Sequence, residues 1–200
     1  MNVLIDKLPT KIKVNDNIYN INSDFRTIIN IILAFEDKEL TNNEQVYIML
    51  KNLYKEEVRQ EDTYEAMKKA LKFIDGGIEP ELENDIKPKR IYSFKKDGNY
   101  IFSGINQTHH INLSENENMH WWVFLSFFMD MSTDCTFGEL IYYRKRKNEN
   151  KLTKEEKEQY KKIKKLVDLD EKDKMSSQVR KEFLDKFREL NKKVRWLTGK

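Results

Sequence analysis

The segment Asn118–Met131 reads NMHWWVFLSFFMDM, whereas the rest of the chain is mostly Lys, Glu, Asp and Asn. A helix that crosses a membrane needs about 20 consecutive apolar residues. The apolar run in this segment is shorter and is interrupted by Ser126 and Asp130. The segment therefore predicts a buried helix of a folded core and not a membrane anchor.

The residues just before this segment indicate where that helix begins. Ser114-Glu-Asn-Glu117 matches a capping box, in which the serine and the second glutamate satisfy amides of the first helical turn. The sequence thus predicts one helix over 115–131. Apolar residues on most of its sides predict a position at the centre of the core, and His120 is interpreted as a hydrogen-bonded structural residue near its start.

The composition favours a helical protein of one domain or two small ones. The chain has 200 residues, of which 38% are hydrophobic and 36% charged, with only six glycines and three prolines. Few turn-forming residues argue against an all-β fold. A single cysteine excludes an internal disulfide, and no signal-peptide pattern is visible, so we expect a cytoplasmic protein.

Periodicity and capping residues divide the chain into short elements. Alternation at period two predicts a β-hairpin over 11–21, and helical spacing predicts helices elsewhere. One shorter helix is predicted from Asp97 to about Ile105, followed by an extended or loop segment at His109–Leu113. Other helices are predicted to begin at Ser23-Asp24, Thr41, Asp62, Thr133 or Thr136, Thr153 and Ser176-Ser177, with Gly76-Gly77 ending the one that starts at Asp62.

These elements predict a mainly α fold: a multi-helix bundle with a short N-terminal β-hairpin and charged C-terminal helices. We expect a hairpin-plus-helix region at 1–77, a linker at 78–90, a core helical region at 91–168 and an amphipathic C-terminal helix at 169–200. The alternative is that all of these regions form one continuous domain. The last helix carries Phe183 and Phe187 on one face and Trp196 near its end.

Charge is distributed unevenly along the chain. Residues 144–200 contain 21 Lys and Arg against 11 Asp and Glu, whereas residues 1–143 contain 16 against 23. The basic part begins at Tyr142-Tyr-Arg-Lys-Arg-Lys147, where aromatic and basic residues adjoin as they do in single-strand nucleic-acid sites. Interleaved carboxylates at Glu155, Glu156 and Glu158 favour a solvated face, so nucleic acid is the less favoured partner here.

No group of residues predicts catalysis or a metal site. His109, His110, His120 and Cys135 include no pair at a familiar zinc-ligand spacing. Cys135 lacks a glycine-rich oxyanion turn and is better interpreted as a small buried residue before a helix. No phosphate-binding glycine motif is present. We therefore expect a non-enzyme without cofactor or metal.

Two blocks of the sequence resemble the bacteriophage gene-product-fifteen family of phages and prophages of Gram-positive bacteria. One is Tyr19-Asn-Ile-Asn-Ser-Asp-Phe-Arg26, and the other is Met119-His-Trp-Trp-Val-Phe124, preceded by Ile111-Asn-Leu and followed by Thr136-Phe and Arg144. The resemblance covers about residues 10–165. The chain departs from the family pattern at Asn112, at Val123 and after residue 168.

The resemblance implies a place in phage tail assembly more than a chemistry. Such genes lie between those for the tail tube and the tape measure, which implies a tail assembly chaperone that binds the tape-measure protein or tail tube subunits in the host cytoplasm. Self-association through the acidic and basic parts is a further expectation. A structural tail or head-completion protein is the alternative, and a basic nucleic-acid-binding protein is the second alternative. The family motif and structural core would include His120, Trp121, Trp122, Phe124 and Phe128; candidate partner-binding residues are Tyr142, Arg144, Arg146, Phe183, Phe187 and Trp196.

Overall fold

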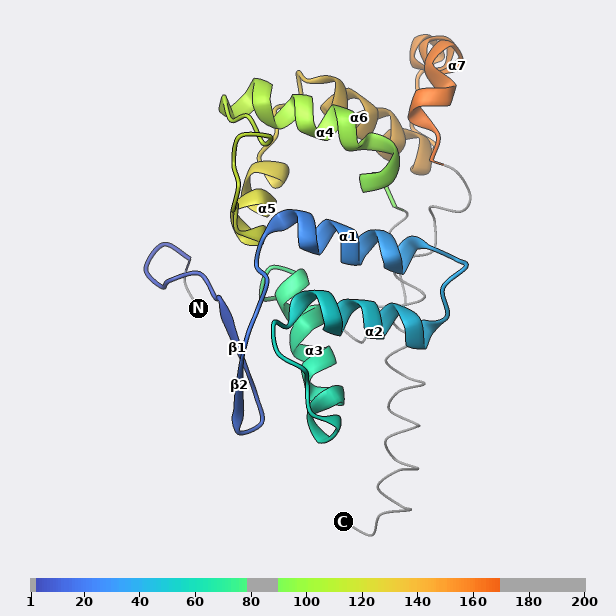
Figure 1. Ribbon diagram of the computed structural model, residues 1–200. Coiled ribbons are helices and arrows are strands. Elements are labelled where there is room, and N and C mark those ends of the chain that lie inside the picture. The colour runs from blue at the N-terminus through green and yellow to red at the C-terminus, as the bar shows by residue number, and fades with distance from the viewer. Residues whose placement is uncertain (1–2, 79–89, 170–200) are drawn as a thin grey trace. The chain divides into compact units, whose positions relative to one another are not determined.

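A computed structural model describes residues 3–78 and 90–169 and confirms the mainly α fold with a short N-terminal hairpin (Figure 1). The described chain divides into two compact units. The first contains residues 3–78 together with 118–122, and the second contains residues 90–117 and 123–169. The predicted linker at 78–90 and the predicted last helix, with Phe183, Phe187 and Trp196, lie almost wholly outside the described residues.

The first unit begins with the predicted hairpin. Strands β1 (Lys11–Val14) and β2 (Asn17–Asn20) pair antiparallel, with Ile12 opposite Tyr19. Their side chains alternate between buried and exposed, as a strand with one buried face requires. Asn15 adopts a left-handed backbone conformation in the two-residue turn, which asparagine tolerates better than most residues.

Three helices complete the first unit, and each begins where the sequence predicts. They are α1 (Phe25–Glu36), α2 (Asn42–Leu53) and α3 (Thr63–Ile74), with a 3-10 turn at Gln60–Asp62 before the last. Asp24 caps α1, and Thr41 and Glu44 form the predicted capping box of α2. Gly76 and Gly77 end α3 in left-handed conformations.

The second unit contains α4 (Phe94–His109), α6 (Thr136–Asn148) and α7 (Lys154–Val167), together with most of α5 (Trp121–Met129). Helices α4 and α6 pack against each other, and α6 packs against α7. The α5 aromatics Phe124 and Phe128 lie against Phe94, and Phe128 also contacts Tyr92 and Phe137 at ring-centroid distances of 5.0 and 5.6 Å. These rings form an aromatic core for this unit.

The prediction of one helix over 115–131 was wrong, because α5 begins only at Trp121. Asn112 takes the preceding residues into a turn: its side chain accepts from the backbone N–H and hydroxyl of Ser114 and donates to Glu115. Local asparagine bonds of this kind compete with helix formation. The exposed Met129 also shows that α5 is not covered on every side.

Other boundaries in the second unit differ by a few residues. Helix α4 begins at Phe94, not Asp97, because Ser93 caps it, and it extends to His109, after which His110 turns left-handed. The cap of α6 is Cys135, whose Sγ accepts from the Gly138 amide, and not one of the two predicted threonines. The predicted capping box Thr153–Glu156 does begin α7.

Within the described residues, none of the helices has the length and apolar character needed to span a lipid bilayer.

Candidate functional site

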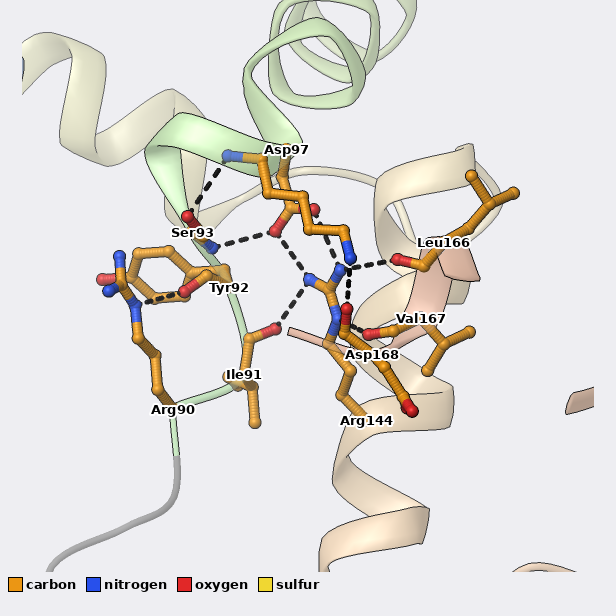
Figure 2. A network of polar contacts seen from close by, with 10 residues as sticks. Arg90, Ile91, Tyr92, Ser93, Asp97, Arg144, Leu166, Val167 and Asp168 are labelled. Atoms are coloured by element: carbon orange, nitrogen blue, oxygen red, sulfur yellow. Dashed lines mark hydrogen bonds and ion pairs between the residues drawn. The ribbon is translucent and has the colours of Figure 1, made fainter. Parts of the chain in front are cut away.

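A buried guanidinium organises the second unit (Figure 2). Arg144 on α6 is 4% exposed and pairs with the fully buried Asp97 on α4. Its two terminal nitrogens donate to the two carboxylate oxygens of Asp97 at 2.6 and 2.9 Å, which is the bidentate geometry that arginine favours. The pair joins residues 47 positions apart in the sequence.

The other three N–H groups of Arg144 bind backbone carbonyls. They donate to Val167 at 2.6 Å, to Leu166 at 3.1 Å and to Ile91 at 3.1 Å. A guanidinium has five N–H donors, so every donor of Arg144 has an acceptor. The side chain thereby holds the end of α7 and the segment before α4 against α6.

Asp97 also binds backbone at the start of α4. Its Oδ2 accepts from the backbone amide of Ser93 at 2.9 Å, while the Ser93 hydroxyl accepts from the amide of Lys96 at 3.2 Å. These bonds satisfy amides that the first helical turn leaves without partners. The carboxylate therefore fixes both the helix start and the guanidinium.

Two of the predicted partner-binding residues lie together on the outside of the α6–α7 hairpin. Tyr142 is exposed, and its hydroxyl donates to Glu156 Oε1 at 2.5 Å. Arg146 Nε donates to Glu156 Oε2 at 3.0 Å. The bonds from Tyr142 and the Thr153 amide, with the nearby Arg146, lower the pKa of Glu156 to about 2. The third such residue, Arg144, is buried in the network described above.

The His-Trp-Trp motif belongs to the first unit and closes the C-terminal end of α3. Trp121 Nε1–H donates to the carbonyl of Ile74, and Trp122 Nε1–H donates to that of Phe73, both at 2.8 Å. The last carbonyls of a helix have no partner within the helix. Trp122 also stacks on the Phe73 ring at 5.6 Å, so the two indoles act as a side-chain cap for α3.

The backbone of this motif pairs with the other family motif. The amide of Trp121 donates to the carbonyl of Ser23 at 2.7 Å, and the amide of Phe25 donates to that of Met119 at 3.0 Å. Asp24 and His120 thus face each other in an antiparallel bridge. Two sequence blocks almost a hundred residues apart form one structural unit.

The partners of His120 fix the tautomer of its neutral ring. Nδ1 accepts from the backbone amide of Trp122 at 3.1 Å, which requires the proton to be on Nε2. Nε2–H then donates to the carbonyl of Pro9 at 3.0 Å. Burial lowers the pKa of His120 below its ordinary value of 6.5, although the bond to Pro9 acts in the opposite direction.

Another buried carboxylate, Asp62, holds the hairpin to α3. It accepts from the side-chain amides of Asn15 and Asn17 at 2.7 and 2.8 Å and from the Tyr19 hydroxyl at 2.7 Å. The bonds from Tyr19 and Asn15 lower the pKa of Asp62. Asp62 precedes α3 as predicted, but its side chain caps nothing because these partners occupy it.

The described histidines and the cysteine do not converge on a common site. Nε2 of His109 contacts the carbonyl of Phe127 at 3.0 Å, and the buried Cys135 donates to the Ser132 carbonyl and caps α6. Across residues 3–78 and 90–169, no group of three histidine, cysteine or acidic side chains is placed to hold a metal ion.

Sequence reasoning missed Asp62 and Asp97 as organising residues. Nothing local distinguishes them from the many other acidic residues, since their partners are 43 to 47 positions away. The five predicted motif and core residues were expected on one helix; α5 contains four of them, and His120 lies directly before it. The structure assigns His120, Trp121 and Trp122 to the first unit, and Phe124 and Phe128 to the second.

The fold and these sites define a helical protein whose buried polar groups serve to position its elements. Comparison with known families identifies it further: the chain belongs to the bacteriophage Gp15 protein family, whose sequence model matches residues 4–169. No curated protein and no solved structure matches the chain. Membership of this family supports a structural or assembly role in a bacteriophage.

Proposed function

We propose that this protein is a tail assembly chaperone that binds the tape-measure protein in the host cytoplasm while tail tube subunits polymerise around it. The observation that carries the proposal is membership of the bacteriophage Gp15 family over residues 4–169. The resemblance implies that genes of this kind lie between those for the tail tube and the tape measure. In this role the protein binds and releases its partner without catalysis.

Exposed apolar side chains on both units support a binding role. In the first unit Ile18 and Tyr47 are 66% and 65% exposed. In the second unit Met129 is 80% exposed at the end of α5, and Tyr142 is 47% exposed on α6. An amphipathic helix of the partner would cover such side chains with its apolar stripe. Several copies along one long helical substrate would keep it from aggregating.

Co-expression with the tape-measure protein tests the proposal. We expect a complex that co-purifies and a larger soluble fraction of the tape-measure protein than when it is expressed alone. Unchanged solubility together with no complex would refute the chaperone function. Tyr142→Ala should weaken the complex if the ring is covered, whereas Tyr142→Phe keeps the ring, loses only the hydroxyl bond to Glu156, and serves as the matched control.

The alternative is a structural tail or head-completion protein, which the same family membership also supports. Mass spectrometry of purified particles separates the two functions. A chaperone is displaced before the tail is complete and should be missing from mature particles. A structural protein should be present in a fixed ratio to the tail tube subunit.

A further inference from the structure

The solvent face of α7 is densely basic. The helix packs through one stripe that contains Glu156, Tyr160, Ile163 and Val167, and the last three join a core with Leu140 and Tyr143 of α6. All other residues of α7 are exposed. Six of these are lysines, at positions 154, 157, 161, 162, 164 and 165.

One carboxylate of α7, that of Glu156, does not lie on this exposed face. Glu156 is partly buried and is bound by Tyr142, Arg146 and the Thr153 amide. Only Glu155 and Glu158 remain exposed on the helix, and Glu158 is paired with Lys161 at 2.7 Å. The exposed residues of α7 therefore have a formal excess of four positive charges.

Three of the lysines lie on one line along the helix. Positions 154, 161 and 165 are within about 40° of one another at 100° per residue and extend over about 16 Å. Duplex DNA carries about ten phosphate charges over that length, at one charge per about 1.7 Å of its axis. The row of ammonium groups is thus matched in sign and extent to a nucleic-acid backbone.

We propose that the solvent face of α7 binds the phosphate backbone of nucleic acid without sequence selectivity. Lysine ammonium groups contact phosphates as point charges, and contacts to phosphate carry no sequence information. An acidic protein surface is a poorer match, because the centres of protein–protein interfaces are depleted in lysine and enriched in aromatic residues. This function is additional to the proposed chaperone function and does not depend on it.

Fluorescence anisotropy of the full chain with a labelled 20-base-pair duplex of arbitrary sequence tests the proposal. If four or five lysines neutralise phosphates, log K should fall against log salt with a slope of about −4. A rise from 50 to 200 mM NaCl should then weaken binding by roughly two to three hundred-fold. A duplex of different sequence should bind equally well.

A triple variant, Lys154→Gln, Lys161→Gln and Lys165→Gln, assigns the binding to this face. Glutamine keeps a similar helix propensity, so the fold should persist, which circular dichroism checks. We expect at least tenfold weaker binding at 50 mM NaCl and a slope smaller in magnitude by about 2.7. Lys11→Gln with Lys13→Gln, two exposed lysines of β1 in the first unit, is the control and should change neither quantity.

Three results would overturn the proposal. The first is no binding of the wild-type chain to the duplex at 50 mM NaCl. The second is a triple variant that is folded and binds the duplex as tightly as the wild type. The third is binding of a labelled polyglutamate peptide as tight as that of the duplex, which would assign the face to acidic protein segments. Tape-measure binding by the triple variant plays no part in this test, so either proposal can be refuted while the other stands.

Discussion

Replacement of Arg144 by methionine should destabilise the second unit severely. Methionine keeps much of the side-chain volume but leaves the fully buried carboxylate of Asp97 without its guanidinium. It also removes the donors to three backbone carbonyls, those of Ile91, Leu166 and Val167. Breaking a buried ion pair from one side typically costs about 3–5 kcal/mol, and we expect a loss in this range.

Arg146→Met is the matched control, with the same substitution one half-turn further along α6. Arg146 pairs with Glu156 at 3.0 Å, but both side chains are partly exposed to solvent. Exposed ion pairs contribute about 1 kcal/mol or less. Because only the Arg144 pair is buried, Arg144→Met should reduce the free energy of unfolding several-fold more than Arg146→Met.

Urea unfolding followed by far-ultraviolet circular dichroism measures both losses, and hydrogen exchange of α4, α6 and α7 amides assigns them to the second unit. Combining Arg144→Met with Asp97→Leu should recover about 1–2 kcal/mol relative to Arg144→Met alone, because no buried charge is then stranded. If Arg144→Met costs about as little as Arg146→Met, the importance assigned to the buried pair is wrong.

Three further predictions concern the His-Trp-Trp motif and the glycines. Trp122→Ala should cost about 3–5 kcal/mol, and Trp121→Ala at least as much because its ring is more deeply buried; a loss below 1 kcal/mol in urea would mean that the rings are not packed as described. The pKa of His120 is lowered in the folded protein, so the unfolded state binds the proton more readily and stability should fall as pH drops below 6.5. His120→Asn can still accept from the Trp122 amide and should lose this pH dependence, which unfolding curves recorded from pH 7.5 to 5 would show. Gly77→Ala should lower the free energy of unfolding by more than 1 kcal/mol, because φ is +88° and a Cβ would lie 3.0 Å from the Trp122 ring. Gly98→Ala in α4 has open space around the new Cβ and should raise that free energy by about 0.5–1 kcal/mol. Equal shifts of the two thermal unfolding midpoints would contradict this expectation.

Sequence reasoning succeeded where the determining interactions are local. The capping boxes at Thr41 and Thr153 and the Gly76-Gly77 stop involve residues within one or two turns, and the structure has all of them. The family was likewise identified from short contiguous blocks. In these places the spacing of nearby residues is enough to predict the helix boundary.

It failed where another partner, near or far in the sequence, competes with the predicted helix cap. Ser114–Glu117 has the residue pattern of a capping box, but Asn112 engages Ser114 and Glu115 in a turn instead. Asp62 has the position of a helix cap, but three donors from the hairpin occupy its carboxylate. A single sequence does not reveal which of two competent partners a side chain will bind.

The polar groups of the His-Trp-Trp motif are bound within the first unit. His120 binds Pro9, the amide of Trp121 binds Ser23, and the indole of Trp122 binds Phe73. The side chain of His120 thus joins the motif to the segment before β1, and both indoles join it to the end of α3, so each side chain uses its polar group inside the protein. A side chain committed in this way has no donor left for a partner. We therefore expect the motif to stabilise the fold, and we expect binding at exposed side chains such as the ring of Tyr142 and the lysines of α7.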